Sequence, residues 1–357
     1  MLADFEKLMT VAFEQAEKGL GYTSPNPPVG AIVFKNGRII SRGYHRQAGQ
    51  PHAEIEALRK AGNAARGATL VTTLEPCSHH NKKTPPCADA IIAAGIKRVV
   101  GAVNDKNPRV NGRGYRKLKA AGVETVTGVL KEKAEELYAP YFKFITTGMP
   151  FVTLKYAQSI DGRIATASGH SRWISSPQSL KLSHKLRAVN DSILIGNGTL
   201  NADDSQLTTR LVKGSNPVRV ILSHSGKIDY GKSIFKDSSA PTYVAVSEKA
   251  EPLAFENVIR LREDGGGLDL PQLLEKLGEM DIVSLLVEGG SGVLTSFLKQ
   301  KLADRVIVCI APIIIGRGKE AVGDLGTERI DKSLELEKIE WSRSGPDMIA
   351  AGNPVWR

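Results

Sequence analysis

The sequence predicts an α/β protein with two domains. Short apolar runs alternate with segments whose apolar residues recur at helical spacing, which is typical of strands followed by helices. The chain has 357 residues, 41% hydrophobic and 24% charged, so either half is long enough to bury a core. Turn-forming residues at 146–150 separate the halves. We therefore expect domains at residues 1–146 and 150–357.

The first half begins with an amphipathic helix and a hairpin. From Phe5 to Lys18 the apolar residues fall on one face, and Gly19 can end the helix. Asn36-Gly37 is a strong hairpin signal between strands at 29–35 and 38–43, because both residues tolerate positive φ. Alternating elements follow, which imply a three-layer domain: helices at 53–61, 87–94, before 122 and at 130–144, and strands at 68–73, 98–102 and 124–127.

The second half is a further β/α series. Six strands are expected near 151–157, 192–195, 218–222, 242–246, 284–287 and 305–310. Three helices are expected near 177–188, 271–280 and 292–299.

Composition excludes several classes of protein. Three cysteines do not make a disulfide framework in so long a chain, so we expect a cytoplasmic location. There is no apolar segment typical of a secretory signal, and no apolar run approaches the ~18 residues that span a bilayer. Nearly all of the net charge of +10 falls in residues 1–146. This basic half suits an anionic partner, either a phosphorylated small molecule or nucleic acid, or is simply a basic surface.

Three side chains in the first half predict a zinc site: His52, Cys77 and Cys87. One imidazole and two thiolates suit Zn²⁺, and three protein ligands leave a fourth position for water. Bound zinc lowers the pKa of that water toward ~7. Glu54, near the start of the expected helix, can take the water's proton and return it to a substrate nitrogen. His-x-Glu followed by Pro-Cys is the pattern of zinc nucleobase deaminases, although here nine residues instead of two separate the cysteines.

These residues have other interpretations. His-x-Glu alone is common, and Cys77 and Cys87 could be free thiols, a disulfide or a redox pair. His79 and His80 could replace His52 as ligands. They lie too close to Cys77 in sequence to join it without strain, so we expect them to line a pocket or to be exposed.

Around this site the chain resembles the deaminase half of the bifunctional riboflavin biosynthesis proteins. The matching segments are Ser24-Pro25-Asn26-Pro27-Pro28-Val29-Gly30, Leu74-Glu75-Pro76-Cys77-Ser78-His79, Thr84-Pro85-Pro86-Cys87 and Asn107-Pro108-x-Val110-x-Gly112-x-Gly114. The chain departs from the family in having nine residues between the cysteines instead of eight. It also has Asp105-Lys106 where the family has Asp-Pro.

The resemblance implies a cytidine-deaminase-like first domain with a three-layer α/β/α fold. Its substrate would be a phosphoribosylamino-pyrimidine made from GTP, which loses one ring amino group as ammonia. Asn26 would hold the pyrimidine edge by this analogy, although beside two prolines it is almost as well suited to a turn.

The second half has a glycine-rich stretch between an expected strand and helix, at Glu288-Gly289-Gly290-Ser291-Gly292. Free backbone N–H groups there could bind a phosphate, or the glycines could form only a tight turn. This half resembles the reductase half of the same family. The matching segments are Lys155-x-Ala157-x-Ser159-Ile160-Asp161-Gly162, Gly169-x-Ser171-x-Trp173-Ile174, Leu186-Arg187-Ala188, Gly196-x-Gly198-Thr199, Asp203-Asp204-x-x-Leu207-x-x-Arg210 and Val287-Glu288-Gly289-Gly290. Ser205 replaces a usual proline, and Ser223-His224 replaces Asp-Ser or Asp-Thr.

That resemblance implies a dihydrofolate-reductase-like α/β domain that uses NADPH to open a ribosyl group to ribityl. Lys155 and Asp203 would hold the sugar and assist proton transfer. The implied NADPH contacts are Ala157, Trp173, Thr199, Asp203, Gly290, Ser291, Gly292, Val293, Leu294, Thr295 and Ser296. The implied substrate contacts are Ser171, Arg187, Leu207, Arg210 and Glu288. The simpler alternatives are surface charges for Arg187 and Arg210, a core position for Trp173 and a helix cap for Asp203.

Three functions suit parts of this sequence. A bifunctional deaminase and reductase, with no nucleic-acid or membrane partner, accounts for both halves. A tRNA-editing deaminase would explain the basic first half, but not the Thr84-Pro85-Pro86 segment or the second half. A zinc-stabilised nucleotide sensor would not need Glu54. The family's tendency to assemble leads us to expect a homodimer.

Overall fold

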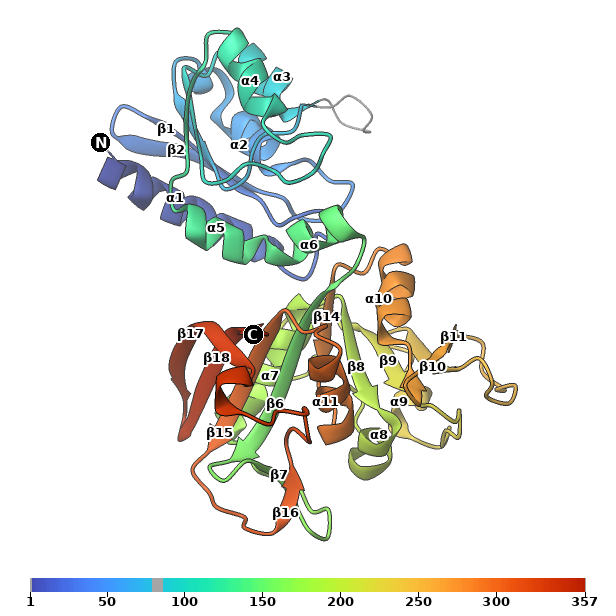
Figure 1. The fold of residues 1–357 in the computed structure, drawn as a ribbon. Coiled ribbons are helices and arrows are strands. Elements are labelled where there is room, and N and C mark those ends of the chain that lie inside the picture. The colour runs from blue at the N-terminus through green and yellow to red at the C-terminus, as the bar shows by residue number, and fades with distance from the viewer. Residues whose placement is uncertain (1, 79–85, 357) are drawn as a thin grey trace. The chain divides into compact units, whose positions relative to one another are not determined.

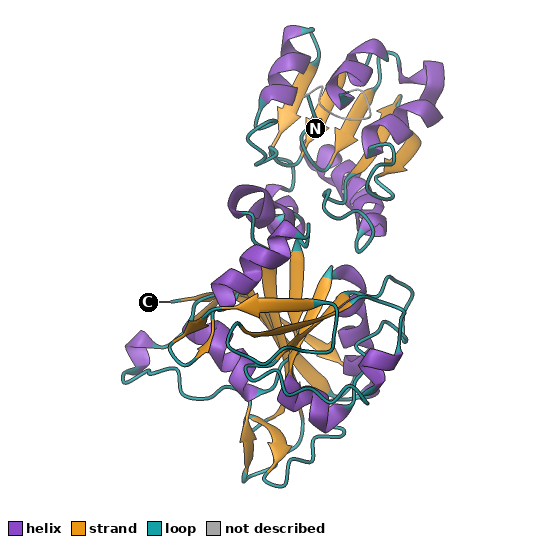
Figure 2. Ribbon diagram, turned by 90° about the vertical axis from the view of Figure 1, so that its right-hand side faces the viewer, coloured by secondary structure: helices purple, strands orange, loops and turns teal. Residues whose placement is uncertain are grey.

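The computed structural model describes residues 2–78 and 86–356, which form two units, Met1–Gly148 and Met149–Arg357 (Figure 1). In each unit, helices flank a sheet (Figure 2). Within the described residues, no helix combines the length and apolar character that a membrane crossing requires.

The first unit is built on a five-stranded sheet in the order β2-β1-β3-β4-β5. Strand β1 is antiparallel to β2 and β3, whereas β3, β4 and β5 are parallel. The strands are β1 (Gly30–Lys35), β2 (Arg38–Tyr44), β3 (Thr69–Thr72), β4 (Arg98–Gly101) and β5 (Glu124–Thr127). The helices are α1 (Leu2–Ala16), η1 (Glu17–Gly19), α2 (Ala53–Ala61), η2 (Gly62–Ala65), α3 (Cys87–Ala93), α4 (Arg113–Ala120), α5 (Lys131–Leu137) and α6 (Ala139–Thr147).

Alternation along β1 supplies side chains to both faces of this sheet. Ala31 and Val33 join a core with α2, α3 and α4, while Ile32 joins a core with α1, α5 and α6. The unit is therefore the predicted three-layer α/β/α domain. Two glycines let helices lie directly against the sheet: an added Cβ would stand 2.0 Å from the Ala12 carbonyl oxygen at Gly30, and 2.2 Å from that of Ala53 at Gly43.

The second unit is built on a nine-stranded sheet in the order β11-β10-β9-β8-β14-β6-β15-β18-β17. It is parallel from β11 to β15, and β18 and β17 add an antiparallel edge. Its strands are β6 (Phe151–Ser159), β8 (Ser192–Gly196), β9 (Val218–Leu222), β10 (Thr242–Ser247), β11 (Val258–Leu261), β14 (Ser284–Val287), β15 (Arg305–Ala311), β17 (Glu335–Ser344) and β18 (Asp347–Val355). Two small pairs are β7 (Arg163–Thr166) with β16 (Gly318–Glu320), and β12 (Glu263–Asp264) with β13 (Gly267–Leu268).

Helices cover both faces of the second sheet. Leucines of α10 and α11 pack with the strands in one large core, and Leu200 of α8 and Leu186 of α7 contribute to a core on Ile193 and Ile195. The helices are α7 (Pro177–Val189), α8 (Asn197–Asp203), α9 (Ser233–Lys236), α10 (Leu270–Glu279), α11 (Ser291–Lys299) and η3 (Ile330–Lys332).

Most expected elements are present within one or two residues of their predicted bounds. The single helix expected at 130–144 was wrong: it is two helices, α5 and α6. Tyr138, at φ −95° and ψ 2°, interrupts the helix, and Pro140 stands in the first turn of α6.

Candidate active sites

Three elements of the first unit bring the predicted metal ligands together. His52 is the N-cap residue of α2, Cys77 follows β3, and Cys87 is the first residue of α3. His52 Nδ1 lies 3.2 Å from Cys87 Sγ and 3.6 Å from Cys77 Sγ. All three ligand atoms lie within 4.8 Å of one another. One nitrogen and two sulfurs at this spacing fit a zinc ion with one open coordination position. His79 and His80 lie outside the described residues.

The protonation states of this group are coupled. The Cys87 backbone N–H donates to Cys77 Sγ at 3.3 Å. A hydrogen bond from the Cys87 thiol lowers the pKa of Cys77 to about 3, and the same bond, with burial, raises the pKa of Cys87. Burial also raises the pKa of Glu54, which is only 3% exposed. Glu54 therefore holds a proton more readily than an exposed carboxylate does.

A cavity of about 220 Å³ opens beside these residues. Asn26, His52 and Glu54 all line it. Asn26 Nδ2 lies 3.3 Å from His45 Nε2, so the amide is oriented by a neighbouring imidazole. The lining residues are Pro25, Asn26, Pro27, Val29, His45, His52, Glu54, Leu74, Glu75, Cys77, Asp105, Asn107, Arg109, Val110, Tyr141, Phe144 and Ile145.

Several cavity residues were missed from the sequence. His45 follows β2 and is almost fully buried, and Asp105 follows β4. The Asp105 carboxylate accepts a hydrogen bond from the Tyr141 hydroxyl of α6, 3.2 Å from Oδ1. A signal for Asp105 existed: it follows a strand parallel to the one that precedes Cys77, and such strand ends share one edge of a sheet.

In the second unit, Arg187 of α7 and Glu288, which follows β14, form a buried ion pair. Arg187 Nη2 lies 2.6 Å from Glu288 Oε2, and the side chains are 10% and 11% exposed. Burial alone would raise the pKa of Glu288, but the charges of Arg187 and Lys155 outweigh it and hold the pKa below its usual value. Because the pair is buried, the alternative that Arg187 is a surface charge is excluded.

His184, one turn before Arg187 on α7, was also missed. Its Nδ1 accepts the Arg210 backbone N–H at 2.9 Å, while the Arg210 side chain bonds Gln206 and Thr208. Burial, followed by the charges of Arg187 and Arg210, lowers the pKa of His184 to about 4. The ring is therefore neutral near pH 7 and can accept this bond. Its spacing of three residues from Arg187 was the available signal.

The expected NADPH contacts come from several elements of the second unit. Gly290 is the N-cap residue of α11, and a Cβ added there would lie 3.2 Å from Thr199 Oγ1 of α8. Ala157 lies in β6, and Asp203 ends α8. Thr295 and Ser296 bond backbone oxygens inside α11. Bare glycine N–H groups at this helix start fit an anionic cofactor.

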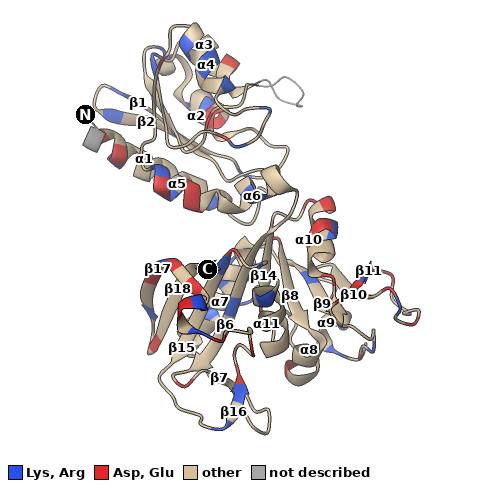
Figure 3. Cartoon of the chain, viewed as in Figure 1, with Lys and Arg blue, Asp and Glu red and all other residues tan. Residues whose placement is uncertain are grey.

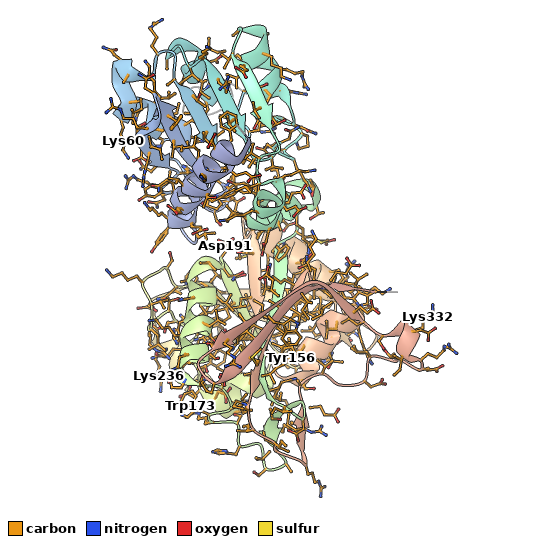
Figure 4. All side chains as sticks on the ribbon, turned by 90° about the vertical axis from the view of Figure 1, so that its left-hand side faces the viewer. Lys60, Tyr156, Trp173, Asp191, Lys236 and Lys332 are labelled. Atoms are coloured by element: carbon orange, nitrogen blue, oxygen red, sulfur yellow. The ribbon has the colours of Figure 1, made fainter. Side chains whose placement is uncertain are left out.

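Four other expected residues have distinct environments. Trp173 is 73% exposed, so it is not a core residue (Figure 4). Arg172 donates to the Asp203 backbone oxygen at 2.6 Å, which joins the segment containing half-buried Ser171 to α8. Leu207 and Leu294, by contrast, have buried side chains, so Leu294 can meet a cofactor only through its backbone.

The excess of positive charge in the first unit is interspersed with acidic side chains. Figure 3 shows this along α5, where Lys131 and Lys133 alternate with Glu132, Glu135 and Glu136. This helix is therefore not a basic surface of one sign.

Two family models match the chain. Residues 3–103 match the cytidine and deoxycytidylate deaminase zinc-binding region, and residues 150–350 match the RibD C-terminal domain. The riboflavin biosynthesis protein RibD of Aquifex aeolicus is 45% identical, with 98% of each chain covered. That of Escherichia coli K12 is 38% identical, with 96% of this chain and 97% of the relative covered.

Solved structures agree over the whole length. The Thermotoga maritima diaminohydroxyphosphoribosylaminopyrimidine deaminase/5-amino-6-(5-phosphoribosylamino)uracil reductase is 40% identical, covers 99% of each chain and has a TM-score of 0.86. Acinetobacter baumannii RibD is 35% identical, covers 99% of this chain and 100% of its own, and has a TM-score of 0.88.

Proposed function

Since the chain belongs to the RibD family of riboflavin biosynthesis proteins, we propose which residues carry each of its two reactions. It is a bifunctional enzyme: a zinc-dependent deaminase and an NADPH-dependent reductase. We assign the deaminase to residues 1–146 and the reductase to residues 150–357. The substrate we propose is the diaminohydroxyphosphoribosylaminopyrimidine named for the Thermotoga relative.

The observation that carries the deaminase assignment is the buried Glu54 beside the three ligands, within one cavity. His52, Cys77 and Cys87 would hold the zinc, which would supply hydroxide at neutral pH. Glu54 takes a proton from the attacking water and delivers it to the ring amino group. The water oxygen bonds to the ring carbon, the carbon–nitrogen bond breaks, ammonia leaves and a carbonyl group replaces the amino group. Asn26, oriented by His45, holds the pyrimidine edge.

For the reductase, we assign to Lys155 and Asp203 the roles of holding the sugar and assisting proton transfer. Bound NADPH supplies the hydride that opens ribosyl to ribityl. The ion pair of Arg187 and Glu288 lies near Arg210, because His184, one turn before Arg187, accepts the Arg210 backbone N–H. Arginine suits the ribose phosphate because its planar fork binds two oxygens. Ser171 and Leu207 complete the proposed substrate contacts.

The cofactor contacts that we propose are the eleven residues expected from the sequence. The start of α11 supports them, since Gly290 caps the helix without a side chain and the space beside Gly292 is open, so that an anion can approach. We also propose a homodimer in the cytoplasm, where reducing conditions keep the thiolate ligands available. Neither a nucleic acid nor a membrane is needed for these reactions.

The test is an assay on the pyrimidine that follows ammonia and NADPH separately. Glu54→Gln should retain about one zinc per chain and lose ammonia release, because only the acid/base is removed. Glu56→Gln, two residues further along α2, is the matched control and should remain active. Full ammonia release by Glu54→Gln would remove this residue from the mechanism.

A second arm separates the two activities. Lys155→Ala should impair NADPH oxidation and leave ammonia release intact, because the residue lies in the other unit. If tRNA were deaminated and the pyrimidine were not, the proposed substrate would be wrong.

A further inference from the structure

We propose that Glu75 is a positioning residue of the deaminase site, which holds the substrate-facing segment 105–114 at a fixed place relative to the metal ligands. The proposal rests on the deaminase function proposed above. Glu75 stands two residues before Cys77 and is 3% exposed. Its carboxylate accepts three backbone N–H bonds: Asp105 N to Oε2 at 3.1 Å, Gly112 N to Oε2 at 2.8 Å and Gly114 N to Oε1 at 2.9 Å.

Two of these bonds cap helix α4. The first N–H groups of a helix have no partner inside it and need an acceptor from elsewhere. The N-cap residue is Gly112, which has no side chain to serve, so Glu75 serves instead from 37 residues earlier in the sequence. A carboxylate there also interacts favourably with the helix dipole.

Close packing leaves the helix start little room to move. A Cβ added to Gly114 would lie 2.0 Å from the Pro76 carbonyl oxygen and 3.1 Å from Glu75 Oε1. Gly112 adopts φ +78°, which favours glycine. The beginning of α4 thus lies directly against the chain that leads to Cys77.

The bonded segment also lines the cavity. Asp105, Asn107, Arg109 and Val110 all face it, together with Glu75 itself. Asn107, Arg109 and Val110 lie between Asp105 and Gly112, the two ends of the segment that Glu75 holds. Inside the segment, Asp105 Oδ1 accepts the Asn107 N–H at 2.8 Å, and Asn107 Oδ1 accepts the Arg109 N–H at 3.0 Å. A shift of either end therefore moves this part of the cavity wall with respect to Cys77.

The test is Glu75→Gln, assayed for ammonia release with zinc content measured on the same sample. Glutamine places an N–H₂ donor against backbone N–H donors, so at least one bond is lost. We expect kcat/KM to fall about tenfold, mostly through KM, as for one hydrogen bond to a charged group. Zinc content and NADPH oxidation on the deaminated pyrimidine should not change. Amide hydrogen exchange across 105–114 should become faster.

Glu75→Asp, which keeps the charge but shortens the side chain, should behave in the same way and replaces Glu75→Gln if that variant does not fold. Glu56→Gln is the control, because Glu56 also accepts a backbone N–H, that of Tyr44 at 3.0 Å, but does not line the cavity. Unchanged KM and exchange, a fall in kcat alone, or loss of zinc would each overturn the proposal. An inactive wild-type protein would instead refute the proposed function.

Discussion

Glu288→Gln removes the negative charge that faces Arg187 and Lys155 inside the second unit. Breaking a buried ion pair by removing one partner costs about 3–5 kcal/mol, because the other charge stays buried. The Arg187 Nη2 to Glu288 Oε2 distance of 2.6 Å and the exposures near one tenth place this pair in that class. Two unit charges ~4 Å apart at an effective dielectric constant of ~20 attract by about 4 kcal/mol. Glutamine keeps one acceptor, so we expect a loss of about 3 kcal/mol.

Urea unfolding, monitored by tryptophan fluorescence, measures this loss of stability in the second unit. The chain's three tryptophans, Trp173, Trp341 and Trp356, all lie in Met149–Arg357. With a denaturant slope of about 2 kcal/mol/M, the midpoint should fall by about 1.5 M. Zinc content and ammonia release, which depend on the first unit, should not change.

Two further variants make this experiment decisive. Glu340→Gln is the control, because Glu340 pairs with Arg305 at 3.6 Å on the surface and is 62% exposed. The double variant Arg187→Met with Glu288→Gln should lose less stability than the two single changes added together. A loss below about 1 kcal/mol for Glu288→Gln, no larger than expected for an exposed pair, would refute the reasoning.

Two further predictions concern stability. Because the pKa of His184 is about 4, below its ordinary 6.5, the unfolded chain binds the proton more readily, and the second unit should lose stability as pH falls from 6.5 to 4. His184→Asn, which keeps an acceptor for the Arg210 N–H, should make the urea midpoint less dependent on pH. An equal pH dependence in the variant and in the wild type would exclude His184 as the cause. Gly30→Ala should lower the free energy of unfolding of the first unit by about 1–3 kcal/mol, because the added methyl group forces α1 away from the sheet. Calorimetry measures this loss. Gly198→Ala, with open space for the methyl, is its control, and equal melting temperatures would contradict the packing argument.

The metal ligands could be identified from the sequence because each stands in a local pattern. His52 precedes a helix with a clear start, and Cys77 and Cys87 each follow a proline in a recognisable segment. The bonding partners of His45 and His184 could not be identified in this way. They are Asn26 and Arg210, 19 and 26 residues away, a separation that no local periodicity encodes.

The presence or absence of a local pattern also explains which elements of the fold could be predicted. Buried strands such as β14 were predicted because continuous apolar runs are rare outside a core. Strand β17 was not predicted, because it is exposed along nearly all its length and its edge position removes the alternation that marks a half-buried strand. The interruption at Tyr138 is also invisible to periodicity, because the apolar pattern continues through it.

The two thiolate ligands are anchored by a strand end and a helix start that are bonded to each other. Cys77 follows β3 and Cys87 begins α3, and the Ala88 N–H bonds directly to the Cys77 carbonyl oxygen at 3.1 Å. Ligand spacing is therefore set by the strand and the helix. In evolutionary terms, the zinc chemistry depends on keeping the end of one strand and the start of one helix side by side, so a substitution that displaces either element would be selected against even far from the metal.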